Sequence, residues 1–216
     1  MIQGYAEGLK LNVNEDEENR NFYCDVITDE AARMNRLVTQ LLSLARTESG
    51  NAIPEIICFD IAEMACRVLR KSRLVLEERG IDASIEGEEH SLVSADYDMI
   101  EQVLTNYITN AIDHTSGDNK LIVRIDNGSD KVRVSVFNSG DPIPPESIDS
   151  IWTSFYKTDK ARTREHGGTG LGLSIVKAIQ DAHGNAYGAA NVEGGVEFWF
   201  DVDAAPETDL DMGVPG

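Results

Sequence analysis

Apolar residues near the start of the chain recur at the spacing of amphipathic helices. A first helix is predicted over residues 1–10 and a second over residues 22–45. In the second helix, Ile27, Met34 and Leu41 stand seven residues apart, the repeat of a helix that packs along another helix. A short polar stretch separates the two helices, so the pattern predicts a helical hairpin.

The predicted hairpin has an apolar seam that two helices cannot enclose by themselves. Two copies of the chain would bury this seam in a four-helix bundle, so we expect a homodimer. The alternative is that the hairpin packs against the core of its own chain.

A cluster of turn-forming residues at 48–54 ends this helical pattern and marks a predicted domain boundary. We therefore expect the hairpin to occupy residues 1–50 and a second domain to occupy residues 51–203. Residues 204–216 are acidic, contain two prolines and are expected to form a disordered tail.

In the second domain the apolar pattern changes between helical and strand periods. One helix is predicted from Asp60, which can cap its first turn, to Gly80, which can end it. Another helix is capped by Asp96. Its expected buried face consists of Ile100, Val103, Leu104, Tyr107, Ile108, Ala111 and Ile112.

Short strands are also predicted in this domain, and one pair forms a hairpin. They lie at residues 81–85, 91–93, 121–125, 132–136 and 196–202. Asn127-Gly128 stands between the third and fourth strands, and this dipeptide is a strong signal for a tight turn. A further helix is predicted after Leu173.

The chain is strongly acidic, with 38 Asp and Glu residues against 19 Lys and Arg and a formal net charge of −19. This balance argues against nucleic acid as a partner, because phosphate backbones are bound by surplus positive charge. The local exception is a basic segment containing Lys157, Lys160, Arg162 and Arg164. It indicates a small polyanion held at one place, and a solvated loop with chance charges is the alternative.

Residues 167–173 read Gly-Gly-Thr-Gly-Leu-Gly-Leu and lead directly into a predicted helix. Glycine has no Cβ and tolerates positive φ, so such a loop can bring its backbone N–H groups close to a ligand. At the start of a helix these groups favour phosphate. A flexible surface turn is the alternative, and the adjacent basic segment favours the phosphate site.

Asn106 and Asn110 lie one turn apart on the helix that follows Asp96. Asparagine is unfavourable inside a helix, so two of them in line suggest a polar cavity. An amide oxygen is a ligand suited to Mg²⁺, whose remaining ligands are waters and phosphate oxygens. Two solvent-facing amides are the alternative.

The helical asparagines, the Asn-Ser-Gly turn at Asn138, Phe155 and the glycine run follow one another in a specific order. This order resembles that of the N box, first G box, F box and second G box of sensor histidine kinases. Residues 51–203 are thus similar to the ATP-binding catalytic domain of that family. The resemblance implies an α+β fold, a two-layer α/β sandwich with a mixed sheet, shared with gyrase, MutL and heat-shock chaperone ATPases. Residues 1–50 resemble the later part of the family's dimerisation and phosphotransfer hairpin.

The resemblance also implies roles for individual residues. Asn110 would bind Mg²⁺, and Asn106 would help position the phosphates and act in catalysis with Lys157 and Arg162. The implied ATP-binding residues are Asn106, Asn110, His114, Asn138, Gly140, Ile143, Phe155, Lys157, Lys160, Arg162, Gly168, Thr169, Gly170, Leu171, Gly172 and Leu173.

The sequence departs from the family pattern at three positions. Asn138 stands where the family has an adenine-reading aspartate, so an amide oxygen without charge would accept from the adenine amino group. Pro142 replaces a glycine and stiffens the loop. Asp113 stands where the family often has a basic residue and brings a negative charge near the phosphates.

None of the four histidines has the neighbours of the family's phosphoacceptor box. We therefore interpret the chain as a fragment without its phosphoacceptor. The resemblance implies the cytoplasmic part of a sensor in the inner or plasma membrane, with the membrane helices upstream. Its partners would be ATP, Mg²⁺, a histidine outside the fragment and a response regulator receiver domain.

The sequence leaves two other functions as alternatives. A gyrase-type ATP hydrolase would carry a water-activating glutamate one turn before the magnesium ligand, where this chain has Asn106. A nucleotide-free docking or dimerisation module would explain Asn138 and Asp113, but the glycine run and Asn110 argue against it.

Overall fold

The computed structural model describes residues 2–10, 16–48, 53–156 and 169–205. Contacts within the chain divide it into two compact units, Met1–Ala45 and Arg46–Gly216. The predicted boundary at residue 50 falls at 49–52, outside the described residues. Within the described part, no helix combines the length and apolarity needed to cross a bilayer.

The first unit contains the two helices that the sequence predicts. They are α1 (Ile2–Lys10) and α2 (Glu17–Glu48). Tyr5 of α1 packs edge-on against Phe22 and Tyr23 of α2, with ring centroids 6.3 and 5.2 Å away. A Cβ at Gly8 would come within 2.6 Å of the Tyr23 ring, so a glycine lets the helices approach here.

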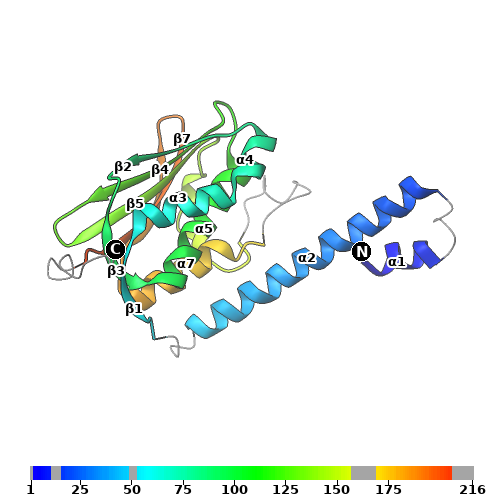
Figure 1. Ribbon diagram of the computed structural model, residues 1–216, viewed down its shortest axis with the longest axis horizontal. Coiled ribbons are helices and arrows are strands. Elements are labelled where there is room, and N and C mark those ends of the chain that lie inside the picture. Colours follow the sequence, from blue (N-terminus) through cyan, green and yellow to red (C-terminus); the bar gives the residue numbers. More distant parts are fainter. Residues whose placement is uncertain (1, 11–15, 49–52, 157–168, 206–216) are drawn as a thin grey trace, which may run out of the picture. The chain divides into compact units, whose positions relative to one another are not determined.

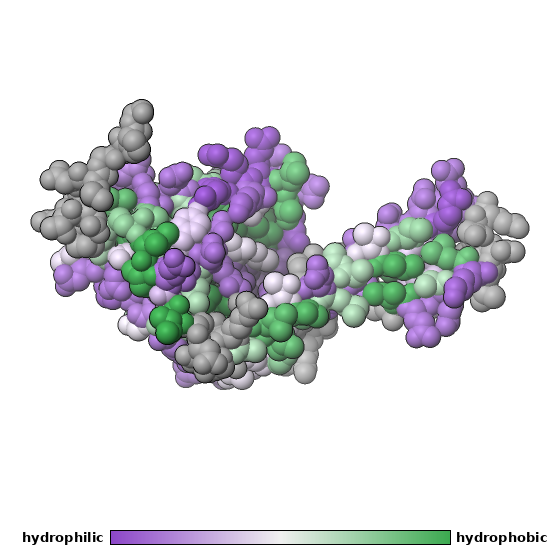
Figure 2. All heavy atoms as spheres, turned by 60° about the horizontal axis from the view of Figure 1, so that its bottom comes forward, coloured by the Kyte–Doolittle hydropathy of each residue, from purple (hydrophilic) through white to green (hydrophobic). Residues whose placement is uncertain are grey.

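Large apolar side chains are open to solvent on α2, and Figure 2 shows such side chains on the surface of the hairpin. Those that are at least half exposed are Phe22, Met34, Val38, Leu41 and Leu42. Met34, Val38 and Leu41 follow one another at intervals of four and three, so they share one face of the helix. About half of the surface of these three side chains therefore remains exposed to solvent.

The second unit is built on a five-stranded mixed sheet with strand order β2-β4-β5-β7-β6. Its strands are β2 (Asp82–Gly87), β4 (Lys120–Asn127), β5 (Lys131–Ser139), β7 (Gly195–Asp203) and β6 (Tyr187–Val192). β2 pairs with β4 in parallel, and the other neighbours are antiparallel. A separate antiparallel pair is formed by β1 (Ile56–Asp60) and β3 (Leu92–Asp96).

The helices of this unit form a layer on one face of the sheet, as Figure 1 shows. They are α3 (Ile61–Lys71), α4 (Arg73–Arg79), α5 (Tyr97–His114) and α7 (Gly172–His183), with short 3-10 turns η2 (Pro145–Ser147) and η3 (Ser150–Trp152). α5 is the central helix, since it contacts α3, α7 and β5. The predicted two-layer α/β sandwich with a mixed sheet is confirmed.

The core lies between α5 and the sheet. All seven apolar residues predicted for the buried face of α5 are buried. Tyr107 is the largest of them, and its hydroxyl donates to the Trp199 carbonyl at 3.2 Å. Burying a large apolar side chain stabilises the fold by roughly 1.5–3 kcal/mol, so this one helix face contributes much of the folding free energy.

The prediction of one helix from Asp60 to Gly80 is wrong in one respect, because the helix breaks at Ser72. The Ser72 N–H is shared between the Val68 and Leu69 carbonyls, and its hydroxyl donates to the Val68 carbonyl. Such side-chain bonds compete with the continuing helix. Gly80 does end the second segment, in a left-handed conformation with φ of 63°.

Two strands, β1 and β6, were not predicted. β1 has no clean alternation, since its first three residues are all exposed. β6 reads Tyr-Gly-Ala-Ala-Asn-Val, which is poor in strand-forming residues. Both strands form because a partner, β3 or β7, offers backbone hydrogen bonds.

The tail expected from residue 204 starts later than predicted. The Ala204 N–H donates to the Asp130 carbonyl, and the Ala205 N–H donates to the Leu92 carbonyl. These two residues therefore belong to the folded unit. Residues 206–216 lie outside the described part, so the nature of the tail stays a prediction.

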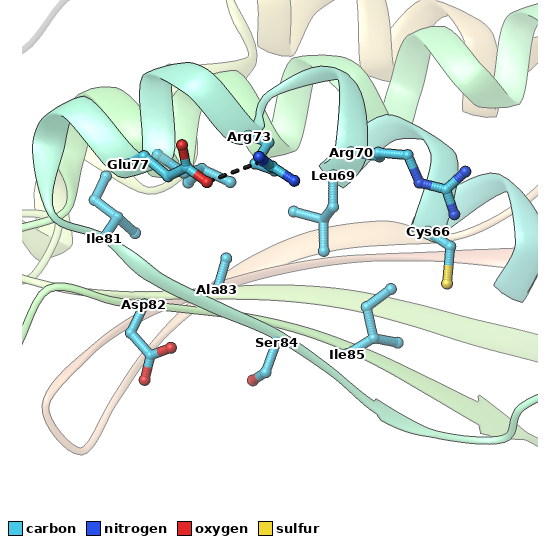
Figure 3. A pocket seen from close by; sticks show the side chains of 11 residues that line it. Cys66, Leu69, Arg70, Arg73, Glu77, Ile81, Asp82, Ala83, Ser84 and Ile85 are labelled. Carbon is cyan, nitrogen blue, oxygen red and sulfur yellow. Dashed lines mark ion pairs between the residues drawn. The ribbon is translucent and has the colours of Figure 1, made fainter.

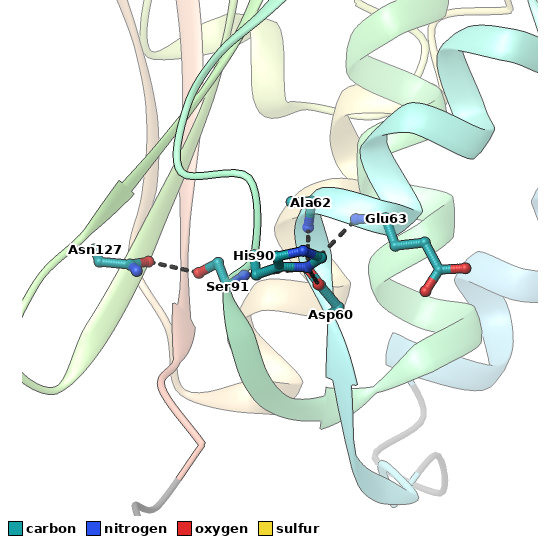
Figure 4. A network of polar contacts seen from close by, with 6 residues as sticks. All are labelled: Asp60, Ala62, Glu63, His90, Ser91 and Asn127. Atoms are coloured by element: carbon teal, nitrogen blue, oxygen red, sulfur yellow. Dashed lines mark hydrogen bonds and ion pairs between the residues drawn. The ribbon is translucent and has the colours of Figure 1, made fainter. Parts of the chain in front are cut away.

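Asp60 joins β1, α3 and the β2–β3 connection through one carboxylate. It accepts from the backbone N–H groups of Ala62 and Glu63, which it caps as predicted, and from the N–H of Ser91. The His90 ring lies 2.8 Å from its other oxygen (Figure 4). Partial burial by itself would raise the pKa of Asp60, but hydrogen bonds from His90 and these amides outweigh it and lower this pKa.

The same contact gives folding a pH dependence. The hydrogen bond with Asp60, and then its negative charge, raise the pKa of His90 above 6.5. A raised pKa means that protonated His90 stabilises the fold, fully at pH values below 6.5 and less as the pH rises through the folded-state pKa. This contribution requires ionised Asp60, whose pKa is itself lowered.

We therefore expect His90→Ala to reduce the free energy of unfolding more at about pH 5 than at about pH 9. Urea unfolding of both proteins across that range measures the difference. Asp60→Asn is the matched control, because asparagine keeps the helix cap but removes the charge. In that background the difference between the two pH values should shrink to the smaller part due to the charges of Glu63 and Glu89; a difference of undiminished size would contradict the pairing.

Candidate functional site

The predicted helix residues Asn106, Asn110 and His114 lie on one edge of α5, spaced by one turn each. Asn106 and Asn110 are half-buried, and His114 is exposed. The amide nitrogen of Asn106 is buried without a hydrogen-bond partner among the described residues. Because buried polar groups are normally paired, this nitrogen is suited to a group from a ligand.

The start of α7 lies against Asn106. A Cβ placed on Gly172 would be 3.5 Å from the Asn106 side-chain oxygen, so the first turn of α7 and the polar edge of α5 are neighbours. Leu171 is the N-cap residue and provides no side-chain hydrogen bond to this helix end. Among the described residues this helix end has no side-chain cap, so its first-turn N–H groups are suited to an anion.

The glycine run also contacts Phe155. The Phe155 N–H donates to the Gly170 carbonyl at 2.8 Å, and both residues have positive φ, 65° and 74°. A Cβ at Gly170 would lie 3.0 Å from the Phe155 Cα, so only glycine fits this contact easily. The bond joins residues on either side of 157–168, which lie outside the described part.

Asn138 lies inside β5, not after it, because β5 continues to Ser139. Its side chain is buried, its amide nitrogen donates to the Ser139 carbonyl at 3.2 Å, and its amide oxygen has no partner among the described residues. This oxygen can accept a hydrogen bond from a ligand. Gly140 follows with φ of 149°, and a Cβ there would be 2.8 Å from the His114 carbonyl oxygen.

Ile143 lies on the loop after β5, where Asn191 of β6 holds its backbone with two hydrogen bonds. Sequence reasoning missed Asn191, because β6 has no alternating pattern that would place it. It also missed Ser139, whose hydroxyl donates to the Ser116 carbonyl and accepts from the Lys120 N–H. These contacts fix the end of α5 against the end of β5.

The structure places the predicted residues on α5, β5, the loop after it and the glycine run, where contacts join Asn106 to Gly172, Phe155 to Gly170 and Gly140 to the end of α5. Those it describes are Asn106, Asn110, His114, Asn138, Gly140, Ile143, Phe155, Thr169, Gly170, Leu171, Gly172 and Leu173. The predicted Lys157, Lys160, Arg162 and Gly168 lie outside the described residues.

The negative charge of Asp113 has a partner on the neighbouring helix. Its carboxylate lies 3.1 Å from the Arg79 guanidinium, which also donates to the Ile112 carbonyl. Both side chains are partly exposed, so solvent weakens this pair. Arg79 still offsets part of the negative charge of Asp113.

The described residues fit a nucleotide with magnesium. An unpaired amide nitrogen, an unpaired amide oxygen and uncapped helix N–H groups match the acceptors and donors of phosphate and a purine base. Asn110 supplies a neutral oxygen, and no cluster of three His, Cys, Asp or Glu suited to a metal occurs among the described residues. A metal held here would therefore depend on phosphate oxygens for most of its charge.

A groove of about 520 Å³ lies elsewhere, between α3, α4 and the edge strand β2 (Figure 3). Leu69 and Arg70 of α3 and Ile85 of β2 are among the residues that line it. None of the predicted site residues lines it. This groove beside α3 and α4 is therefore separate from the candidate site. The candidate site is defined by its polar groups.

Comparisons with known proteins show which proteins this chain is similar to. Residues 95–206 match the family described as histidine kinase-, DNA gyrase B-, and HSP90-like ATPase. The sensor protein SrrB of Staphylococcus aureus is 31% identical over 186 residues, which are 86% of this chain and 32% of that protein. The chain thus spans about a third of the length of such relatives.

Solved structures show the same fold. The catalytic domain of histidine kinase ThkA is 38% identical with a TM-score of 0.63, covering 71% of this chain and 98% of that domain. ThkA in complex with the response regulator protein TrrA is 32% identical with a TM-score of 0.75, covering 95% of this chain and 57% of that chain. Full-length ShkA in complex with AMPPNP is 26% identical with a TM-score of 0.74, covering 87% and 40%.

The family match includes α5, the glycine run and the strands between them, which are the elements that build the site. The chain therefore belongs to the histidine kinase-, DNA gyrase B- and HSP90-like ATPase family, with a catalytic domain of the sensor histidine kinase type.

Proposed function

We propose that this chain binds ATP with Mg²⁺ and transfers the γ-phosphoryl group to a histidine outside the sequence, for relay to an aspartate of a response regulator. The observation that carries this proposal is the contact between Asn106 and Gly172. It joins an unpaired amide and uncapped helix N–H groups in one place. Such an arrangement suits the phosphates of a nucleotide.

In this proposal each described group has a binding or positioning task. Asn110 holds Mg²⁺, which when bound neutralises charge on the phosphate oxygens. Asn106 and the first-turn amides of α7 position the triphosphate. The unpaired oxygen of Asn138 accepts from the adenine amino group, and Gly140 and Ile143 lie beside the base. His114 lines the adenosine side.

The remaining tasks fall on the basic segment. Lys157, Lys160, Arg162 and Gly168 would close over the phosphates, with Phe155 at the start of this lid. Positive charge there would offset the charge that develops during transfer, as phosphoryl transfer requires. These roles rest on the sequence, since the segment lies outside the described residues.

Transfer is favoured over hydrolysis by the residue one turn before Asn110. Asn106 has no carboxylate to activate water, and the carboxylate of Asp113 faces Arg79. AMPPNP in the similar ShkA and the response regulator bound to the similar ThkA support ATP and a receiver domain as partners. We place this fragment in the cytoplasmic part of a membrane sensor, with residues 1–50 as hairpin and 51–203 as catalytic domain.

The first proposal to test is the magnesium ligand. We expect Mg²⁺ to strengthen AMPPNP binding by the wild type by about tenfold, or 1.4 kcal/mol, and to have no effect on binding by Asn110→Ala. Calorimetric titration with and without Mg²⁺ measures both affinities. Thr109→Ala is the control, because Thr109 is exposed on the same helix. Equal magnesium effects in wild type and Asn110→Ala would refute the assignment.

A homodimer through α2 is the second proposal, supported by its exposed apolar face. Burying such faces from two copies would supply the apolar contact of a stable interface, about 1,200–2,000 Å². We expect Met34→Asp with Leu41→Asp to shift light scattering from dimer to monomer while the helical circular dichroism remains. Asn35→Asp adds charge on an exposed position as a control. A wild type that stays monomeric at high concentration would contradict the dimer.

The third proposal concerns the chemistry of transfer. The fragment should not label itself from γ-labelled ATP, yet should label a separately supplied hairpin bearing the missing histidine. Transfer should be slow, because a diffusing acceptor loses a proximity advantage of up to ~7–11 kcal/mol. Acid-labile label on the fragment would refute the missing acceptor. Steady ATP hydrolysis without any acceptor would instead favour the gyrase-type hydrolase.

A further inference from the structure

The loop that follows β5, residues 140–144, is held between two parts of the fold. On one side lies the end of α5, where a Cβ on Gly140 would come within 2.8 Å of the His114 carbonyl oxygen. On the same side, the Ser116 N–H donates to the Ser139 carbonyl at 3.0 Å. The start of the loop therefore cannot move toward α5.

The other side of the loop faces the β6–β7 hairpin. The Gly140 N–H donates to the Gly194 carbonyl at 3.2 Å, which fixes the start of the loop. Asn191 fixes its later part. The Ile143 N–H donates to the Asn191 side-chain oxygen at 2.8 Å, and the Asn191 amide nitrogen donates to the Ile143 carbonyl at 2.8 Å.

The residues of the loop explain why an asparagine side chain suits the contact with Ile143. Ile143 stands between Pro142 and Pro144, neither of which has a backbone N–H, so Ile143 alone offers a donor across these three residues. An asparagine side chain has one donor and one acceptor on the same carbon, which match the N–H and C=O of one residue. Asn191 thus replaces the pairing that an added strand would provide at the edge of the sheet.

We propose that Asn191 is a positioning residue for the base side of the nucleotide site. This inference rests on the proposed ATP-binding function. Asn138 at the end of β5 and Ile143 on the loop are the two groups proposed to meet the base. Asn191 sets the distance between them, because Ile143 is held to β6 while Asn138 belongs to β5 and both strands pair with β7.

The decisive variant is Asn191→Asp, which keeps the size of the side chain but replaces the donor with a second acceptor. A carboxylate can still accept from the Ile143 N–H but repels the Ile143 carbonyl oxygen. We expect this variant to weaken binding of ADP and AMPPNP by the same factor, about tenfold. We call the two hydrogen bonds between Asn191 and Ile143 the clamp. The strengthening of AMPPNP binding by Mg²⁺ should stay as in the wild type, because the clamp lies away from the proposed phosphate site.

Val192→Ala is the matched control, since Val192 is an exposed neighbour on the same strand and has no part in the clamp. Three measurements decide the outcome. Calorimetry gives the affinities, thermal unfolding without nucleotide gives the stability, and hydrogen exchange at the Ile143 amide reports the clamp itself. We expect faster exchange at Ile143 in Asn191→Asp, with an unfolding midpoint equal to that of Val192→Ala.

Wild-type affinity for both nucleotides in Asn191→Asp would overturn the inference while leaving the proposed function intact. Weaker binding together with a lowered unfolding midpoint would also overturn it, in favour of a role in stability alone. Failure of the wild type to bind ADP or AMPPNP would overturn the proposed function itself, and this inference with it.

Discussion

The site depends on α5, which packs against both the sheet and the start of α7. α5 buries an apolar face against the sheet, and the burial of Tyr107, Ile108 and their neighbours fixes both the position and the rotation of the helix. Asn106 is adjacent to Tyr107 in the chain, so the same packing places its amide at the start of α7. Asparagine in this position lowers the helix propensity, and its buried amide nitrogen has no partner among the described residues. Both effects destabilise the fold. The fold tolerates that cost because the apolar face is large.

Two glycines make close approaches that keep the site compact. Gly140 lies against the end of α5, and Gly170 lies against the backbone of Phe155. Any side chain at either place would meet backbone atoms at about 3 Å or less and would also require an unfavourable positive φ. The site is thus formed by backbone groups brought close together, and among the described residues the charge that it offers an anion comes from helix N–H groups. This suits an acidic protein, in which positive side chains are scarce.

The two units of the chain differ in how they are stabilised. The catalytic domain encloses its apolar residues between a helical layer and a sheet, with Asp60 and Ser72 shaping the ends of its helices. The hairpin holds α1 on α2 through a small aromatic cluster around Tyr5, yet leaves much of α2 without apolar contacts. A surface of this kind is stable in water only where a further partner covers it or where the apolar patches remain small. The two units thus differ in that one encloses its apolar core and the other leaves an apolar face open to solvent.

The sequence by itself determined the features that depend on local pattern. The apolar stripe of α5, the β4–β5 hairpin around Asn127-Gly128 and the glycine run before α7 follow from periodicity, turn chemistry and the lack of a Cβ. Only the tertiary structure decided which distant groups meet. β6 forms because β7 pairs with it, Asn191 reaches Ile143 across 48 residues, and Arg79 reaches Asp113 from another helix. These contacts leave no trace in local periodicity, because their energies arise only when the packed core has brought the segments together.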